Sequence, residues 1–434
     1  MTDASDSVMI ANQKEKVRES LRKRLRSERR FRAYGVVAIS FAVLMLVFLI
    51  GTIISNGYSA FSQTWLKVDV TLEKDLIAPD GRTDPKTLRE NGDFRASLIE
   101  SLVAKFKSRG REEERLLMAM FSTSAEQTLQ EHVIRNPNEI GGTVSIWVRA
   151  SSDIDQLYKG RINRDLPQTS RTVKDIQLRW YDLMAAERRI DSRFNKGFFY
   201  SGDSREPEQA GFWGAIVGSF FTMLVTLILA FPVGVATAVY LEEFAPKNRF
   251  TDLIEVNINN LAAVPSIVFG LLGLAVFLNF FELPRSAPLV GGMVLALMTL
   301  PTIIISGRAA LKAVPPSVRE AALGLGASRV QVVTHHVLPL AMPGILTGTI
   351  IGMAQALGET APLLMIGMVA FIVDIPGGPT DASTVIPVQI YLWADSPERG
   401  FVEKTSGGIM VLLIFLVTMN ASAVYLRKKF ERRW

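Results

Sequence analysis

One carboxylate stands where ionised groups are costly, at the end of a long apolar run. Glu359 follows residues 340–358, which contain no charged side chain. Counting along the run places Glu359 near mid-membrane, where a charged residue costs roughly 2.5–3.5 kcal/mol on insertion scales. Such residues usually face a bundle interior or an aqueous path. We therefore expect Glu359 to lie on a solute path or its gate, or to form a structural ion pair between two spans.

The residues after Glu359 predict an interrupted helix. Thr360 and Pro362 follow it directly, and a proline removes a backbone donor from a continuing helix. The freed N–H groups at the start of a half-helix can bind an oxyanion. Thr360 therefore joins Glu359 as a candidate residue of the path or gate.

Six apolar runs organise the 434 residues, 48% of which are hydrophobic. A run of about 20 apolar residues is long enough to cross a hydrocarbon core of roughly 30 Å. The fifth run is long for one span and contains prolines, so we expect it to be kinked or to begin before the membrane. The predicted spans cover residues 33–54, 211–240, 256–281, 287–307, 340–371 and 408–426.

The charges flanking these runs predict the orientation. Residues 1–32 carry 10 Lys/Arg against 5 acids, and the tail from Arg427 to Trp434 carries 5 basic residues against Glu431. Excess positive charge marks cytoplasmic segments, so both termini of this multi-pass chain are expected in the cytoplasm. The basic segment before the first span (residues 1–32), called here the basic lead-in, could also lie on anionic membrane lipid. The charge pattern is not that of a nucleic-acid-binding protein.

Residues 57–209 form a polar, domain-sized insert between the first two spans. Alternating apolar and polar residues predict strands near Leu66–Leu72 and Thr143–Val148. Amphipathic helices are predicted near Ala96–Lys107 and Val173–Arg189. We expect an extracytoplasmic (periplasmic) α+β domain, because a long loop crosses the membrane largely regardless of its charge. The predicted segments are 1–32 (basic, cytoplasmic), 33–56 (first span), 57–209 (insert), 210–427 (five further spans) and 428–434 (basic tail).

The cytoplasmic loop at residues 312–339 carries the most specific pattern. Ser317 with Glu320, and Ser328 with Gln331, are spaced as capping boxes, and Gly326 suits the position that ends a helix. The loop therefore predicts a short helix, a turn and a second helix. The small residues of the first helix would let its backbone seat closely in the cleft of a partner, although an ordinary helical connector has the same pattern.

This loop resembles the EAA loop of ABC-importer permeases, in Glu320-Ala321-Ala322, Gly326 and the closing Val337-Leu338-Pro339. The resemblance implies that Glu320, Ala321, Ala322 and Gly326 form the coupling helix that docks into an ATPase subunit.

Four further segments are similar to the phosphate-specific permeases, the last of them particularly to the PstA type. They are Phe231-Pro232-Val233-Gly234 with Tyr240–Glu243, Val264–Gly270, Gly344–Gly348 and Gly358–Leu364. The resemblance covers about residues 211–430, and the insert is similar to long-form members of the family. The implied fold is an all-α bundle of six transmembrane helices, like a type I ABC importer permease, with an inserted α+β domain.

An anionic solute would be repelled by Glu359, so the resemblance implies a cation near that carboxylate. Arg308 is the best candidate in this chain, and an arginine of a partner chain is the alternative. The pair would act as a gate at which the solute competes for the cation. Arg308 also closes the span at 287–307 on the cytoplasmic side, where snorkelling basic residues are common.

The sequence contains no G-x-x-x-x-G-K-[ST] loop, no HExxH, no GxSxG and no cysteine. We expect a transport subunit rather than an enzyme, with no cofactor or metal of its own. ATP and Mg would be bound by a partner ATPase. The resemblance implies a complex with a homologous PstC-type permease, an ATPase dimer and an extracytoplasmic phosphate-binding protein.

Two alternatives stay open at this point. The solute could be another oxyanion, such as sulfate, molybdate or phosphonate, because resemblance alone selects phosphate. The chain could also be a membrane-anchored sensor with residues 57–209 as its ligand domain.

Overall fold

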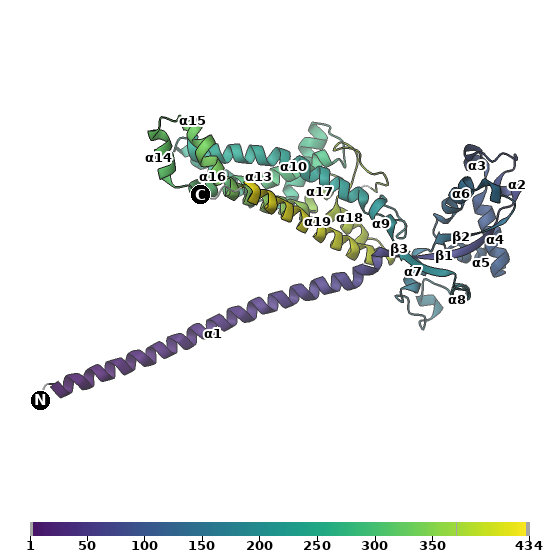
Figure 1. Cartoon of the computed structure of the whole chain (residues 1–434), viewed down its shortest axis with the longest axis horizontal. Coiled ribbons are helices and arrows are strands. Elements are labelled where there is room, and N and C mark those ends of the chain that lie inside the picture. Colours follow the sequence, from purple (N-terminus) through teal and green to yellow (C-terminus); the bar gives the residue numbers. More distant parts are fainter. Residues whose placement is uncertain (1–2, 370, 431–434) are drawn as a thin grey trace. The chain divides into compact units, whose positions relative to one another are not determined.

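The computed structural model describes residues 3–369 and 371–430, in two compact units of residues 1–55 and 56–434 (Figure 1). The first unit consists of most of α1 (Asp3–Gly57), which no proline interrupts. The basic lead-in and the first predicted span thus form one helix. Its apolar residues between 33 and 52 are exposed, as a lipid-facing helix requires. Of the predicted basic tail, residues 431–434 lie outside the described residues.

The insert contains a three-stranded antiparallel sheet with the order β2-β1-β3. The strands are β1 (Ser62–Thr71), β2 (Thr143–Arg149) and β3 (Ile190–Phe194). Leu66, Val68 and Val70 alternate into a buried face, because side chains along a strand point to opposite sides. The intervening Lys67 and Asp69 belong to the other face. The predicted strands and the α+β character of the insert are confirmed.

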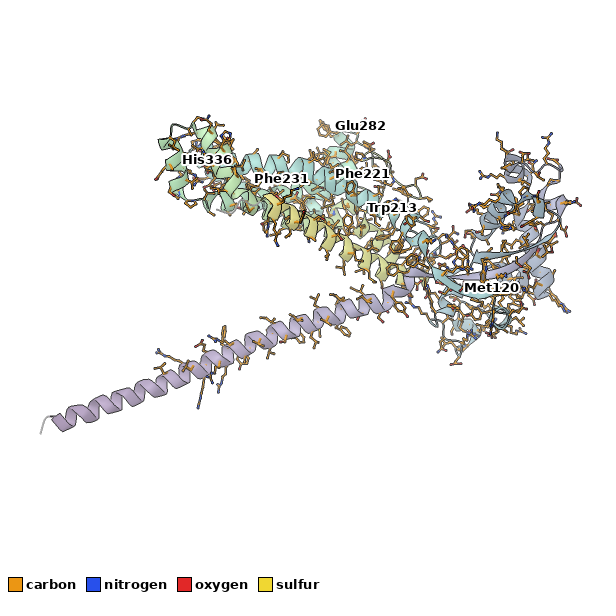
Figure 2. All side chains as sticks on the ribbon, in the orientation of Figure 1. Met120, Trp213, Phe221, Phe231, Glu282 and His336 are labelled. Carbon is orange, nitrogen blue, oxygen red and sulfur yellow. The ribbon has the colours of Figure 1, made fainter. Side chains whose placement is uncertain are left out.

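Helices pack on the buried face of this sheet and close one hydrophobic core, in which Met120 is fully buried (Figure 2). The first six are α2 (Lys74–Ile77), α3 (Pro85–Asn91), α4 (Phe94–Phe106), α5 (Gly110–Met118), α6 (Ala125–Arg135) and α7 (Ser152–Tyr158). The last is α8 (Asp175–Ala186), whereas α9 (Lys196–Tyr200) packs through Phe198 in a separate cluster with Phe212 and Trp393. The two predicted helices correspond to α4 and α8.

The membrane part consists of long apolar helices, which confirms the predicted class of fold. The straight spans are α10 (Trp213–Val239), α13 (Pro288–Lys312), α16 (Leu338–Gly358) and α19 (Gly400–Phe430). With α1 they give five helices long and apolar enough to cross a membrane, or six with one bent pair. Short helices α17 (Ala361–Met365) and α18 (Ile386–Ala394) lie between the last two spans.

The span predicted over 256–281 is wrong as a continuous helix. The chain forms α11 (Arg249–Ala262) and α12 (Ser266–Leu272, continuing to Phe280), and the two are bent by 104°. Pro265 explains the break, because a proline disfavours helical geometry in the residue before it.

The limits of the last two predicted spans also need correction. The helix predicted over 340–371 begins at Arg329 and ends at Gly358. It consists of α15 (Arg329–Gln331), a π-helical stretch (Val332–Val337) and α16. The second helix of the predicted loop and the span are therefore one helix. The last helix begins at Gly400 rather than near residue 408, and α18 was not predicted.

Glycines bring α10, α13 and α16 into close contact. Gly234 of α10 faces Ile303 of α13, and Gly348 of α16 faces Ser306 so closely that a Cβ there would lie 1.8 Å from the Ser306 Oγ. Lipid gives helices no hydrophobic reason to associate, so spans depend on small residues that allow their backbones to approach. These glycines fix the three helices that carry the functional segments.

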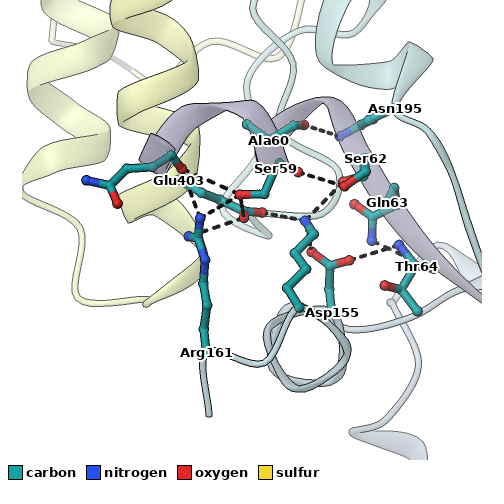
Figure 3. A network of polar contacts seen from close by, with 11 residues as sticks. Ser59, Ala60, Ser62, Gln63, Thr64, Asp155, Arg161, Asn195 and Glu403 are labelled. Carbon is teal, nitrogen blue, oxygen red and sulfur yellow. Dashed lines mark hydrogen bonds and ion pairs between the residues drawn. The ribbon is translucent and has the colours of Figure 1, made fainter. Parts of the chain in front are cut away.

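A buried ionic network joins the insert to the start of α19 (Figure 3). The Nζ of Lys159 lies 2.5 Å from the Asp155 Oδ2 and 2.8 Å from the Glu403 Oε1. The hydroxyl of Ser59 donates to the Glu403 Oε2 at 2.9 Å, and Arg161 donates to that hydroxyl at 2.6 Å. Buried charges are tolerated only when paired and hydrogen-bonded. This junction is therefore a specific contact between the insert and a spanning helix.

Substituting Gly348 by alanine should destabilise the protein by roughly 1–3 kcal/mol, because the added methyl group overpacks α16 against α13. A matched control is Gly324→Ala in the short helix described below, where a Cβ meets nothing within 4 Å. That change should be neutral or stabilise by about 0.5–1 kcal/mol. Thermal unfolding of both variants in detergent measures the difference. Equal stabilities would contradict the packing assigned to Gly348.

Candidate functional site

The loop after α13 contains the short helix α14 (Pro316–Gly324), whose end is sharply defined. Gly326 has φ +86°, and its N–H donates to the Leu323 carbonyl at 2.9 Å. The next N–H, of Ala327, donates to the Ala322 carbonyl at 3.1 Å. This pair of bonds is the Schellman arrangement, in which glycine takes the left-handed position without strain. The predicted helix-ending role of Gly326 is confirmed.

Of the two predicted capping boxes, only the second forms. Ser328 and Gln331 exchange hydrogen bonds, with Ser328 N–H donating to the Gln331 Oε1 at 2.8 Å. The prediction for Ser317 is wrong, because α14 starts one residue earlier, at Pro316, and has no side-chain cap. A proline at the first helical position supplies the required φ and has no N–H to be capped.

One face of α14 is buried and the other carries exposed apolar side chains. Ala322 packs into a cluster with Val314 and Val332, so this predicted docking residue holds the helix in place. Glu320 and Ala321 are exposed. We call the exposed residues the α14 surface: Glu320, Ala321, Leu323 (49% exposed), Leu325 (89%), Gly326 and Val330 (59%).

The three apolar residues of the α14 surface were missed in the sequence. Exposed apolar patches on a protein mark interaction sites. Their position in the sequence could have indicated this surface. Leu325 is the C-cap residue of α14, directly before Gly326, and its side chain points to solvent whereas Ala322 is buried.

Ion pairs hold α14 to the neighbouring spans. The Nη2 of Arg319 lies 2.6 Å from the Glu243 Oε1 just beyond α10, and it donates to the Leu311 carbonyl of α13 at 3.0 Å. The Nη1 of Arg319 donates to the Val314 carbonyl at 2.7 Å. A guanidinium with several acceptors in fixed directions restrains orientation as well as position. Arg319 therefore ties α14 to α13 and to the segment just beyond α10.

Arg308 belongs to the same end of the bundle and pairs with two other carboxylates. Its Nη2 lies 2.5 Å from the Glu255 Oε1 of α11, and its Nε lies 3.4 Å from the Glu242 Oε2. Lys312 reaches Glu242 at 3.7 Å. In the sequence, Glu242 and Glu243 belong to the segment that is similar to the phosphate-specific permeases. Their role as partners of these cations follows from the fold.

The predicted pairing of Arg308 with Glu359 is wrong in this structure. Gly344 faces Ala310 and Gly352 faces Thr302, so α16 runs antiparallel to α13. Continuing this register places Glu359 about 13 residues from Arg308 along α13, which is roughly 20 Å at 1.5 Å per residue.

Glu359 and Thr360 form a break between two helices, as predicted. Glu359 leaves helical geometry at φ −75° and ψ 130°, and α17 begins at Ala361. The carboxylate is half-buried, and within residues 3–369 and 371–430 it forms no hydrogen bond or ion pair. Pro362 of α17 packs against Gly270 of α12. The roles of Glu359 and Thr360 in a path, and of this break in binding an oxyanion, stay predictions.

Two family profiles match the chain. One is described as "Binding-protein-dependent transport system inner membrane component" and matches residues 230–434, a range that includes α14 and Glu359. The other is described as "Domain of unknown function (DUF3333)" and matches residues 18–168.

Curated relatives are similar over the membrane part. The "Phosphate transport system permease protein PstA 1" of Mycobacterium tuberculosis is 31% identical over 229 residues, 52% of this chain and 74% of that protein. The PstA protein of Haemophilus influenzae is 29% identical over 226 residues, 52% of this chain and 78% of its own. A solved inward-facing structure of the MetNI methionine ABC transporter aligns with 51% of this chain at 18% identity and TM-score 0.39, too distant to specify a site.

A double-mutant cycle tests where Arg308 acts. Arg308→Gln should destabilise the protein by roughly 1–3 kcal/mol, because it leaves the partly buried Glu255 without its cation and Glu242 with Lys312 alone. Combined with Glu359→Gln, the effects on unfolding should add within about 0.5 kcal/mol, since the sites are far apart. Combined with Glu255→Gln, they should not add. Coupling of Arg308 to Glu359 instead would contradict the assigned register.

Proposed function

Because this chain belongs to the PstA-type family of ABC importer permeases, we propose that it forms half of the path through which inorganic phosphate is imported. The observation that carries the proposal is the 31% identity to a protein named as a phosphate transport permease, over 74% of that protein's length. The chain is a multi-pass inner membrane protein. Its proposed partner across the path is a homologous PstC-type permease.

The energy for transport comes from an ATPase dimer that binds the ATP and Mg. Its contact with this chain is the α14 surface, where the side chain of Leu325 is the most exposed apolar group. An apolar side chain at the centre of a small contact, rimmed by polar residues such as Glu320, is typical of an interface anchor. Gly326 keeps the backbone beside Leu325 accessible to a close partner.

Movement of the ATPase dimer reaches the spans through Arg319 and Arg308. Arg319 ties α14 to α10 and α13, and Arg308 ties α13 to α11. When the ATPase closes on ATP and displaces α14, these helices move together. The path then changes from inward-facing to outward-facing, and hydrolysis resets it. Glu359, at the break before α17, lies on the path or its gate.

The phosphate arrives from an extracytoplasmic binding protein. Residues 57–209 are proposed to lie on that side, with both basic ends of the chain in the cytoplasm. The insert is joined to the start of α19 through Lys159 and Glu403, so it keeps a defined position beside the entrance.

The substrate is tested with the reconstituted complex. Phosphate-loaded binding protein should stimulate ATP hydrolysis in proteoliposomes that contain this chain and its partners, whereas sulfate, molybdate and phosphonate should not. Stimulation by one of those anions and not by phosphate would reassign the substrate within the same class of importer.

The docking of the ATPase is tested at Leu325. Leu325→Asp should reduce co-purification of the ATPase by about tenfold or more, since it places a charge in an apolar contact. Leu183→Asp is the matched control, because Leu183 is an exposed leucine of the insert (56%). Normal co-purification of the Leu325 variant would exclude the α14 surface as the dock.

The orientation is tested by cysteine labelling, which the cysteine-free chain makes direct. A cysteine replacing exposed Lys86 of the insert should react with an impermeant maleimide in intact spheroplasts. One replacing exposed Glu320 should react only in inverted vesicles. The reverse pattern would overturn the proposed topology.

A further inference from the structure

A polar pocket of about 500 Å³ opens where the insert meets the permease. Trp65, Thr128 and Arg149 contribute from the sheet and helices of the insert, Ser201 and Asp203 from its last segment, and Val373 from the loop after α17. The volume is within the range of small-molecule sites. Gly202 is packed so closely on this loop that a Cβ would lie 1.8 Å from the Val373 carbonyl oxygen. The pocket is therefore built from separate parts of the chain.

Arg149 is the charged group of this pocket that lacks a carboxylate partner. It ends β2, is half-buried, and its guanidinium lies 5.7 Å from the ring centre of Trp65. Two other insert arginines with limited exposure are paired: Arg189 with Asp69 at 2.6 Å, and Arg171 with Asp175. Within the described residues the Arg149 side chain forms no ion pair or hydrogen bond. A guanidinium does not lose its charge in proteins, so its partial burial favours an incoming anion.

Burial lowers the pKa of Arg149, and the charge of nearby Glu208 opposes this change. Glu208 does not form an ion pair with Arg149, and its own pKa is raised by burial. The positive charge of Arg149 is therefore only partly compensated from within the chain.

The two carboxylates that line the pocket have other partners. Glu131 pairs with Arg135 at 3.2 Å on the helix surface. The Oδ1 of Asp203 accepts from the Trp393 Nε1 at 3.0 Å and from the Ser204 N–H at 2.9 Å. Burial also raises the pKa of Asp203. Neither carboxylate replaces a ligand for Arg149.

The remaining lining includes one hydroxyl that can donate to an anion. Ser201 lines the pocket, and within the described residues its hydroxyl donates to no other group. The hydroxyls of Ser124 and Thr128, at the beginning of the 11-residue helix α6, already donate to the Ser122 Oγ and the Ser124 carbonyl. The positive end of α6 still favours an anion in this space.

We propose that this pocket binds a small tetrahedral oxyanion of the phosphate class, with Arg149 as its charged anchor. A guanidinium fork matches two oxygens of such an anion. The existence of this site does not depend on which solute is transported. An anion bound there bridges the insert to the loop that follows Glu359 and α17, and so reports external anion to the permease.

Inorganic phosphate is the probe, added to the full-length chain purified in detergent. Binding is followed by equilibrium dialysis with radiolabelled phosphate and by tryptophan fluorescence. The change in fluorescence that phosphate causes through Trp65 should be absent in Trp65→Phe. Arg149→Gln should weaken binding by roughly ten- to hundredfold, the loss expected for charge-assisted hydrogen bonds. Arg149→Lys, which keeps the charge but not the fork, should weaken it less. Arg164→Gln is the matched control and should bind as the wild type does.

The outcomes separate the possible sources of the anion. Saturable phosphate binding that depends on Arg149 but not on Glu359 supports the pocket, even if transport of phosphate is disproved. Binding lost in Glu359→Gln and kept in Arg149→Gln would place the anion in the path and overturn the inference. No phosphate binding up to about 10 mM, or binding only of a glutamate-rich peptide, would also overturn it, the latter by assigning the pocket to a carboxylate of a protein.

Discussion

Close approach of three spans through glycine is the constraint on which the rest of this structure depends. In a membrane, helices cannot rely on the hydrophobic effect to associate, so contact area must come from close backbones. Gly234, Gly307, Gly344 and Gly348 line the contacts of α13 with α10 and α16. They fix the antiparallel register of α13 and α16. That register places the loop containing α14 at one end of the bundle. It places the break at Glu359 far from that end along the axis of α13.

Charged residues complete this arrangement where the helices leave the membrane. Arg308 and Arg319 each join elements far apart in the chain, through Glu242, Glu243 and Glu255. Such pairs contribute little when fully exposed, but these are partly buried and directional. Together they fix the orientation of α14 relative to α10 and α13 in this structure. A short helix with an apolar, exposed tip and a rigid base is well suited to receive motion from a partner.

Local chemistry made part of the fold and site predictable. Gly326, the Ser328–Gln331 capping box and the alternation of Leu66, Val68 and Val70 each depend on neighbours within a few residues, which the sequence shows directly. The bend at Pro265 was missed because apolar composition measures length and not continuity. Arg308 was assigned to Glu359 because no sequence pattern gives the register of two packed helices. The network of Lys159 with Glu403 joins residues 244 positions apart, beyond any local signal.

The central claim is that this chain moves phosphate and that α14 couples the movement to an ATPase. Its most direct test is uptake of radiolabelled phosphate, under phosphate limitation, by cells that depend on this chain. Gly326→Asp adds a β-carbon at a positive φ and a charge beside Leu325, and Gly324→Ala leaves the surface intact. The account predicts that uptake is lost in the first variant at normal expression and kept in the second. Equal phosphate uptake in wild type, Gly326→Asp and cells without the chain would contradict it.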